Sequence, residues 1–158
     1  MKGFSEQTNK TKKRRAITNE QLTQEYGKLP PQAVDLEEAV LGALLLEKDA
    51  LTEVIDILQP PSFYKEAHQK IYASIQALFQ RSDPIDMLTV KKELQKEGVL
   101  EIVGGPGYIV QLTNKISSAA NIEFHARIIA QKFIQRELIK ISSEIIRDSY
   151  DESSDVFD

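Results

Sequence analysis

Residues 121–146, NIEFHARIIAQKFIQRELIKISSEII, have the length and composition of one long helix whose apolar residues divide between two faces. With successive residues about 100° apart around a helix, four of them form a first stripe, Ile122, Ala126, Ile129 and Phe133. Four others form a second stripe on roughly the opposite side, Ile134, Leu138, Ile141 and Ile145. A helix packed once onto a small globular body needs only one such stripe. The segment therefore predicts a helix with two packing partners.

The second stripe is the less easily covered of the two. The first stripe can pack on the rest of the chain, whereas the second lies toward the end of the helix, where little of the chain is left to cover it. Exposed apolar surfaces of that length usually mark partner sites. The alternative is that the helix kinks or that the rest of the chain curls over the stripe. The residues predicted to take part in self-association are Phe133, Ile134, Leu138, Ile141 and Ile145.

From about residue 29 onward the sequence predicts a succession of short helices. Asp35, Asp49 and Asp86 each precede a segment with helical spacing, and a carboxylate there can accept hydrogen bonds from the first backbone N–H groups. Asp35 also has Glu38 three residues later, as in a capping box. A longer helix is expected over about 65–80. No run alternates with a period of two over more than a few residues, so the expected fold class is all-α, with about six helices.

The last two helices are joined by only a few residues around 117–120. So short a connection predicts an antiparallel helical hairpin. The expected organisation is a compact head of about four helices over 29–103, followed by the hairpin over 104–150. Residues 151–158 are acidic and are interpreted as the start of a linker.

The net charge of −4 conceals an asymmetry along the chain. Residues 1–28 hold seven Lys or Arg against three Glu, a net of +4, and residues 29–158 hold thirteen basic against twenty-one acidic residues, a net of −8. The residues at the centre of the basic excess are Lys12, Lys13, Arg14 and Arg15. They are candidates for nucleic-acid contact. The favoured interpretation of 1–28 is a disordered arm, because it offers few apolar or aromatic residues on which bases could stack.

The sequence offers no catalytic or metal-binding constellation. It contains no Cys, no G-x-x-x-x-G-K-[ST] phosphate-binding motif and no hydrophobic run near the roughly 20 residues of a membrane span. VGGPGY, at 103–108, has neither a preceding strand nor a Lys and is interpreted as a connection between helices. His68 and His125 lie on separate expected helices, whereas a metal needs three or four converging ligands. His68 is expected to be hydrogen-bonded in the core or at a subunit boundary, and His125 is expected to be half-exposed. The chain is interpreted as a cytoplasmic interaction module with no enzymatic activity or cofactor of its own.

Five segments are more specific together than any one of them is alone. In chain order they are PPQAVDLEEAVLGALLLE, FYKEAHQKIYASIQAL, PIDMLTVKKEL, VGGPGYIVQL and AANIEFHARIIAQKFIQRELI. Each is an ordinary helix by itself. In this order, over about 29–150, they resemble the N-terminal domain of the bacterial replicative DNA helicases of the DnaB family.

The resemblance implies a part of a hexameric ring helicase that unwinds duplex DNA 5′ to 3′ at the replication fork. The ATPase, with its ATP and Mg, would lie in a C-terminal domain that no residue of this chain matches. In the family the N-terminal domain forms dimers, three dimers make a collar, and the collar receives the primase. The resemblance also implies DNA as a partner of the full-length ring, allows for a helicase loader, and implies no membrane. The family's primase contacts match Tyr108, Ile139 and Ile145.

Two departures from the family pattern are visible. His125 stands where the family commonly has an aromatic residue, and the basic N-terminal extension is longer than the usual lead-in. Two other interpretations stay open: the helicase-binding C-terminal domain of a primase, which shares the helical plan, and a basic-armed helical DNA-binding protein. The runs AVLGALLLEKDAL and AANIEFHARII favour the helicase. Salt-dependent DNA binding through residues 1–28 would favour the DNA-binding protein.

Overall fold

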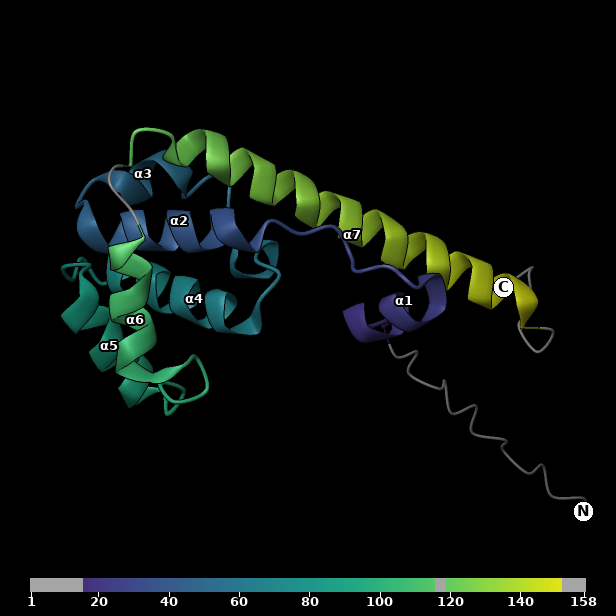
Figure 1. Cartoon of the computed structure of the whole chain (residues 1–158), viewed down its shortest axis with the longest axis horizontal. Coiled ribbons are helices and arrows are strands. Elements are labelled where there is room, and N and C mark those ends of the chain that lie inside the picture. Colours follow the sequence, from purple (N-terminus) through teal and green to yellow (C-terminus); the bar gives the residue numbers. More distant parts are fainter. Residues whose placement is uncertain (1–15, 116–118, 152–158) are drawn as a thin grey trace, which may run out of the picture.

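The computed structural model describes residues 16–115 and 119–151, and within these ranges the chain is all-α. Seven α-helices and one short 3₁₀ helix follow one another there, without a strand. In chain order they are α1 (Asn19–Tyr26), α2 (Val34–Leu46), α3 (Ala50–Val54), η1 (Pro60–Ser62), α4 (Glu66–Gln80), α5 (Met87–Lys96), α6 (Gly105–Asn114) and α7 (Ile122–Tyr150). Figure 1 shows α2 to α6 gathered at one end, with α7 running along this group and projecting beyond it over α1. The predicted fold class is confirmed.

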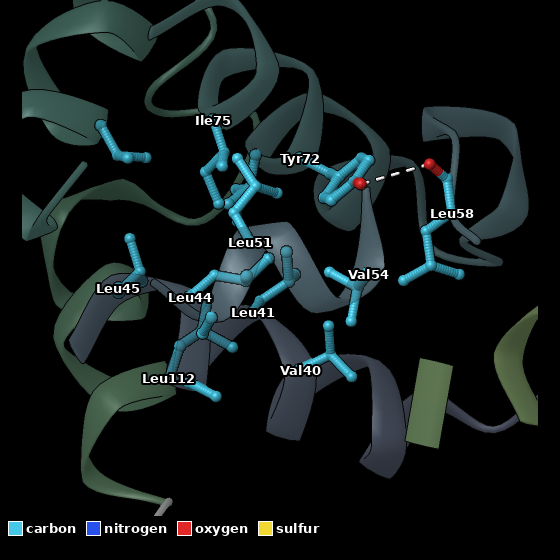
Figure 2. Packing of buried hydrophobic residues seen from close by; sticks show 14 of the residues in the cluster. Val40, Leu41, Leu44, Leu45, Leu51, Val54, Leu58, Tyr72, Ile75 and Leu112 are labelled. Carbon is cyan, nitrogen blue, oxygen red and sulfur yellow. Dashed lines mark hydrogen bonds between the residues drawn. The ribbon is translucent and has the colours of Figure 1, made fainter. Parts of the chain in front are cut away.

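Helix α2 lies at the centre of the core because its sequence is apolar on nearly every side. Its neighbours are α7, α6, α4 and α3. Its buried aliphatic residues are Val40, Leu41, Ala43, Leu44 and Leu45. Figure 2 shows α2 side chains packed among those of Leu51, Val54, Ile75 and Leu112. Full burial of one such side chain contributes roughly 1.5–3 kcal/mol, so α2 is a major source of the stability of the fold.

The connection from α3 to α4 is held by a buried phenol. Tyr72 lies on α4 with no exposed surface, and its Oη donates a hydrogen bond to the carbonyl oxygen of Leu58 at 3.2 Å (Figure 2). Pro60 and Pro61 follow in η1. Helix α3 has already ended at Val54, so the pair does not end it; proline lacks an N–H donor, which suits both residues to the start of η1.

Helix α5 begins at the cap that the sequence predicts. The Asp86 carboxylate accepts hydrogen bonds from the backbone N–H groups of Leu88 at 2.8 Å and Thr89 at 2.9 Å. The Thr89 hydroxyl in turn accepts from the Asp86 N–H at 2.9 Å, which completes a capping box. The predicted role of Asp86 is confirmed.

The other two predicted caps are wrong in detail. Helix α2 begins two residues earlier than expected, with Ala33 as its N-cap residue, so Asp35 lies inside the first turn and caps nothing. Its carboxylate is still favourably placed near the positive end of the helix dipole. Glu38, the expected capping-box partner, instead forms an ion pair with Lys115. Asp49 occupies the N-cap position of α3, but its side chain makes no capping hydrogen bond.

The glycine pair before α6 permits a close backbone approach. Gly104 and Gly105 have φ angles of 112° and 73°, in the left-handed region that favours glycine. A Cβ on Gly104 would lie 2.9 Å from the Cβ of Tyr108. The motif therefore joins two helices, as interpreted from sequence, although most of it forms the first turn of α6 rather than a loop.

Part of the N-terminal segment that the sequence predicts to be a disordered arm is helical. Helix α1 lies at Asn19–Tyr26, well inside the range that was expected to be a disordered arm. Its N-terminus has a capping box, in which the Thr18 hydroxyl accepts from the Gln21 N–H and the Gln21 side chain accepts from the Thr18 N–H. Leu22 of this helix is buried. The helix forms because α7 gives it an apolar surface that is distant in sequence.

Helices α6 and α7 differ from the expected hairpin. Helix α6 packs on α2 and α5, whereas α7 packs on α2, α3 and η1. In Figure 1 the two helices diverge steeply from their short connection instead of lying side by side. The connection does return the chain to the body, but α2 takes the place expected for the hairpin partner of α7.

Helix α7 is one continuous helix of 29 residues. Its buried residues are Ile122, Ala126, Ile129, Arg136 and Ser143. The first of these pack in the core of the head, and the C-terminal half projects beyond the head over α1 (Figure 1). No helix in the described ranges is both long and apolar enough to cross a membrane.

Candidate interaction surface

The second stripe is solvent-exposed along the C-terminal half of α7. Ile134, Leu138, Ile141 and Ile145 each expose between 52% and 60% of their surface. The helix is unbroken across this range, and the head does not reach over it. Four aliphatic side chains at helical spacing thus form a continuous apolar face that residues 16–115 and 119–151 leave uncovered. The alternative of a kinked helix or an enclosing head is excluded.

Two further large side chains near the end of α7 are exposed outside the register of this face. Ile146 exposes 49% and Tyr150 84% of its surface. Phe133, by contrast, is half-buried on the side of the first stripe, with its ring centroid 5.7 Å from the Arg136 guanidinium carbon. The structure therefore places Phe133 apart from the other four residues predicted for self-association.

Arg136 continues the register of the first stripe and anchors the projecting half of α7. Its Nη1 donates to the carbonyl oxygen of Pro31 at 2.8 Å, and its Nη2 donates to that of Ser62 at 2.9 Å. The guanidinium also lies over the ring of Tyr64, 5.5 Å from its centroid. Burial lowers the pKa of Arg136 below its usual value, and the nearby Glu37 carboxylate opposes this effect. One buried cation thus ties α7 to two connections of the head.

Helix α1 covers one flank of the same half of α7. Tyr26 Oη and Ser143 Oγ lie 2.8 Å apart and share a hydrogen bond. The backbone N–H of Ile17 donates to the Glu144 carboxylate at 3.2 Å. Leu22, which lies between Ile17 and Tyr26 in the sequence, is buried. By helical register Ser143 lies on the side of α7 away from the second stripe, so α1 covers the back of the projecting half of α7.

An apolar cleft of about 530 Å³ remains between α1 and α7. The residues that line most of it are Leu22, Tyr26, Leu29, Pro30, Leu138 and Ile139. Leu138 belongs both to this cleft and to the second stripe, so the two apolar surfaces are continuous. We refer to this space as the α1–α7 cleft.

The three residues predicted for primase docking do not lie together. Ile145 is exposed in the second stripe, and Ile139 is half-buried in the α1–α7 cleft. Tyr108 lies in the first turn of α6, and Figure 1 places that helix at the opposite end of the molecule from the end of α7. The structure thus separates the predicted site into one pair and one distant residue.

Tyr108 belongs to a polar cluster in the head. Its Oη lies 2.6 Å from Nε2 of His68, which is fully buried, and Nδ1 of His68 lies 3.4 Å from the buried Glu37 carboxylate. Glu37 also accepts a hydrogen bond from the backbone N–H of Tyr64. Burial, followed by the charges of Glu38 and Glu37, raises the pKa of Tyr108 to about 12. His68 is therefore a hydrogen-bonded core histidine, as the sequence predicts.

Sequence reasoning missed the two buried charges of this region. Glu37 lies on a helix whose sequence predicts burial on most sides. A carboxylate on such a helix needs hydrogen-bond donors, and this could have identified Glu37 from the sequence. Arg136 follows Phe133 by three residues on the first stripe, so helical register alone places it on the buried face. His125 is half-exposed, as predicted. Lys12, Lys13, Arg14 and Arg15 lie outside the described residues, and the described part of the chain holds no cluster of three metal-ligand side chains.

Comparison with known proteins identifies the family. Residues 29–131 match the family model described as the DnaB-like helicase N terminal domain, which is about two-thirds of the chain. The chain belongs to this family.

Its relatives are replicative helicases of which it matches one part. It is 44% identical over 137 residues to the replicative DNA helicase DnaB of Rhodothermus marinus, and 42% identical over 131 residues to the replicative DNA helicase DnaC of Bacillus subtilis. The matched segments cover 87% and 83% of this chain but only 14% and 29% of those two proteins. This DnaB-like N-terminal domain therefore spans a minor part of their length.

Solved structures agree with this assignment. The crystal structure of the N-terminal domain of DnaB helicase from Mycobacterium tuberculosis is 38% identical, with a TM-score of 0.77 over 80% of this chain and 90% of that one. A DnaB-like replicative helicase whose structure was described with its interactions with primase is 27% identical, with a TM-score of 0.66 over 73% of this chain and 27% of that one.

Proposed function

We propose that this DnaB-like N-terminal domain is the collar domain of a hexameric, ATP-dependent replicative DNA helicase, with oligomerisation and partner docking as its own tasks. The observation that carries the proposal is the second stripe, an exposed apolar face on a helix that projects from the head. Exposed apolar surfaces of this kind mark interaction sites. Membership of the DnaB-like N-terminal domain family supports the proposal that the parent protein is a replicative helicase.

The chemistry of unwinding is assigned to another part of the parent protein. ATP and Mg would bind a C-terminal ATPase domain, because this sequence contains no G-x-x-x-x-G-K-[ST] motif. The parent would unwind DNA 5′ to 3′ at the replication fork in the cytoplasm. We therefore expect that this chain by itself neither hydrolyses ATP nor unwinds DNA.

A second copy of the domain is the first proposed partner. Ile134, Leu138, Ile141 and Ile145 form a face that another helix can cover, as apolar faces do in helix pairs. Dimers formed in this way would assemble in threes into the collar of the ring. The exposure of all four side chains in the single chain supports this step.

The primase is the second proposed partner. The support is a solved neighbour, a DnaB-like helicase described with its interactions with primase. Ile145 and Ile139 are close enough in the chain to belong to one such site, whereas Tyr108 contributes mainly to the polar cluster of the head. A helicase loader would be a further partner. The alternative, that the chain is itself the helicase-binding domain of a primase, is disfavoured by the family match.

The test is the mass of the purified chain in solution across a wide range of concentration, followed by titration with the C-terminal domain of the matching primase. The proposal expects a rise from monomer to dimer or higher species, and saturable binding of the primase domain. A chain that stays monomeric at all concentrations and binds no primase domain would contradict it. Binding of an intact helicase ring in place of the primase would favour the alternative.

A further inference from the structure

Helix α1 lies outside the part of the chain that matches the family model. That match begins at residue 29, and α1 ends at Tyr26. Even so, α1 packs against the C-terminal half of α7, where Tyr26 contacts Ser143 and Ile17 contacts Glu144. Helix α1, which lies outside residues 29–131, thus packs on the helix that carries the proposed interaction surface.

The attachment of α1 to α7 is slight. Within the described residues, Leu22 is the buried apolar side chain of α1, and Ile17, just before the helix, is a second. Single hydrogen bonds join Tyr26 to Ser143 and the Ile17 N–H to Glu144. A helix of eight residues is too short to be stable without tertiary contacts. Both hydrogen-bonding groups on α7 are polar and can bond to water when α1 leaves. The contact between α1 and α7 is therefore weak enough to form and break reversibly.

The α1–α7 cleft shows that the two helices do not pack closely. Its volume of about 530 Å³ separates apolar side chains that would gain contacts if it were filled. Leu138 lines the cleft while 60% of its surface is exposed, so the cleft opens onto the second stripe. An apolar partner bound to the stripe would adjoin α1 at this residue.

A hinge for α1 is present between two fixed points. Gly27 has a φ of 63°, and Lys28 and Leu29 after it are exposed. Pro30 is buried, and the Pro31 carbonyl is held by Arg136. A rotation within residues 27–29 could thus move α1 away from α7 while the anchor of α7 on the head stays in place.

We propose that α1 is a displaceable cover on α7, and that a second copy of the chain competes with it for the flank of α7 that carries Ile139 and Ser143. This inference rests on the proposed function, because the competing partner is the self-association partner. The second copy is the occupant we choose because the flank is continuous, through Leu138, with the stripe proposed for self-association. When α1 is displaced, the apolar surface open to that copy widens from the second stripe to include the cleft.

The first arm of the test measures the cover itself in the full chain. Amide hydrogen exchange, followed by mass spectrometry, should show α1 exchanging well before α2, through local opening. Leu22→Asp places a charge in the buried contact and should abolish the protection of α1 while leaving α2 and α4 protected. Gln24→Asp adds the same charge at an exposed position of α1 and should change little. Exchange of α1 as slow as that of α2 in the unaltered chain would overturn the proposal.

The second arm measures self-association of the same three proteins by sedimentation equilibrium. If α1 is docked about ten times as often as it is open, its release should lower the apparent dissociation constant about tenfold when one copy must open, and about a hundredfold when both must. Tyr26→Phe, which removes only the hydrogen bond to Ser143, should give a smaller change in the same direction. Gln24→Asp should match the unaltered chain.

The outcomes separate this proposal from the proposed function. Tighter association of Leu22→Asp supports both. Association that is unchanged or weaker in Leu22→Asp, although α1 is released, overturns the cover and leaves the collar function standing. No association by any of the proteins, with α1 released, overturns both. Improved binding of the primase domain by Leu22→Asp, with unchanged self-association, would overturn the choice of a second copy as the competitor.

Discussion

Nη1 of Arg136 donates a hydrogen bond to the carbonyl oxygen of Pro31, 2.8 Å away. The acceptor belongs to the connection between α1 and α2, and the second acceptor, the Ser62 carbonyl, belongs to η1. Arg136 is itself near the middle of α7, at the point where that helix leaves the head. Arg136 thus fixes the direction in which α7 leaves the head. The orientation of the exposed apolar face therefore depends on its hydrogen bonds to the Pro31 and Ser62 carbonyl groups.

Replacing Arg136 with methionine should therefore destabilise the fold. Methionine keeps an apolar stem of similar length but leaves one buried and one partly buried carbonyl group without donors, which should lower the free energy of unfolding by on the order of 2–3 kcal/mol. Arg127→Met is the matched control, because Arg127 is exposed and pairs only with Glu123 one turn earlier. That pair contributes at most about 0.5 kcal/mol. Urea unfolding of both variants checks this; equal midpoints would contradict the anchoring role.

The sequence predicted much of α7 because period and length decide its main features. The first stripe was expected to face the body, and Ile122, Ala126 and Ile129 are buried. The second stripe was expected to lack cover, and its four side chains are exposed in the part of the chain that the structure describes. Arg136 was missed because a charged residue was not counted in an apolar stripe, although its register was available. Helical period predicts which side of α7 is buried, but it does not name the carbonyls that satisfy a buried cation.

Features that depend on contacts distant in sequence were predicted less well. Helix α1 was missed because a short helix with little apolar content forms only against the surface of α7. The α6–α7 hairpin was inferred from a short connection, which limits the distance between two helix ends but leaves the angle between the helices to packing. Of the proposed interaction residues, Ile145 could be placed from sequence, whereas the separation of Tyr108 from it required the fold.

Of the three aspartates near helix N-termini, only Asp86 should stabilise the fold through a side-chain cap. Asp86→Ala removes the acceptor of two backbone N–H groups and should lower the free energy of unfolding by about 1 kcal/mol. Asp35→Ala and Asp49→Ala should cost less, since neither side chain makes a capping hydrogen bond. Thermal unfolding of the three variants at neutral pH ranks them. A larger loss for Asp35→Ala than for Asp86→Ala would argue against the start assigned to α2.

Stability should fall between about pH 10 and pH 12. Burial raises the pKa of Tyr72 to about 12, and burial with the charges of Glu38 and Glu37 raises that of Tyr108 to about 12. A tyrosine in the unfolded chain has a pKa near 10. The folded state thus holds the neutral phenols, so their contribution is complete below about pH 10 and is lost as the pH rises through the folded pKa values.

Tyrosinate absorbance and denaturant unfolding measured against pH check this expectation. Two of the five tyrosines should ionise late. Tyr108→Phe should remove one of these late ionisations, whereas Tyr150→Phe, which alters an exposed phenol, should keep both. A titration in which all five ionise together near pH 10, with the chain still folded, would contradict the burial of these two groups.

Self-association should depend on the second stripe. Ile141→Asp places a charge in the middle of a face that is already exposed, so it should weaken dimers or higher species while the helical circular dichroism is kept. Gln131→Asp adds the same charge on an exposed part of α7 before the stripe begins and serves as the control. Sedimentation of both variants compares their association. Unfolding of the Ile141→Asp monomer would mean that the stripe belongs to the core.

Primase binding should distinguish the two isoleucines near the end of α7. Ile145→Ala removes about three methylene-sized groups from an exposed site, so it should leave the free energy of unfolding unchanged. At roughly 0.8 kcal/mol per buried group it should weaken binding of the primase C-terminal domain by one to two orders of magnitude. Ile139→Ala, in the half-buried cleft wall, should weaken binding similarly but should also loosen α1, which hydrogen exchange in Asn19–Tyr26 detects. Titrations must compare proteins of equal oligomeric state. Unchanged affinity in both variants would exclude these residues from the primase site and leave them to contacts between subunits.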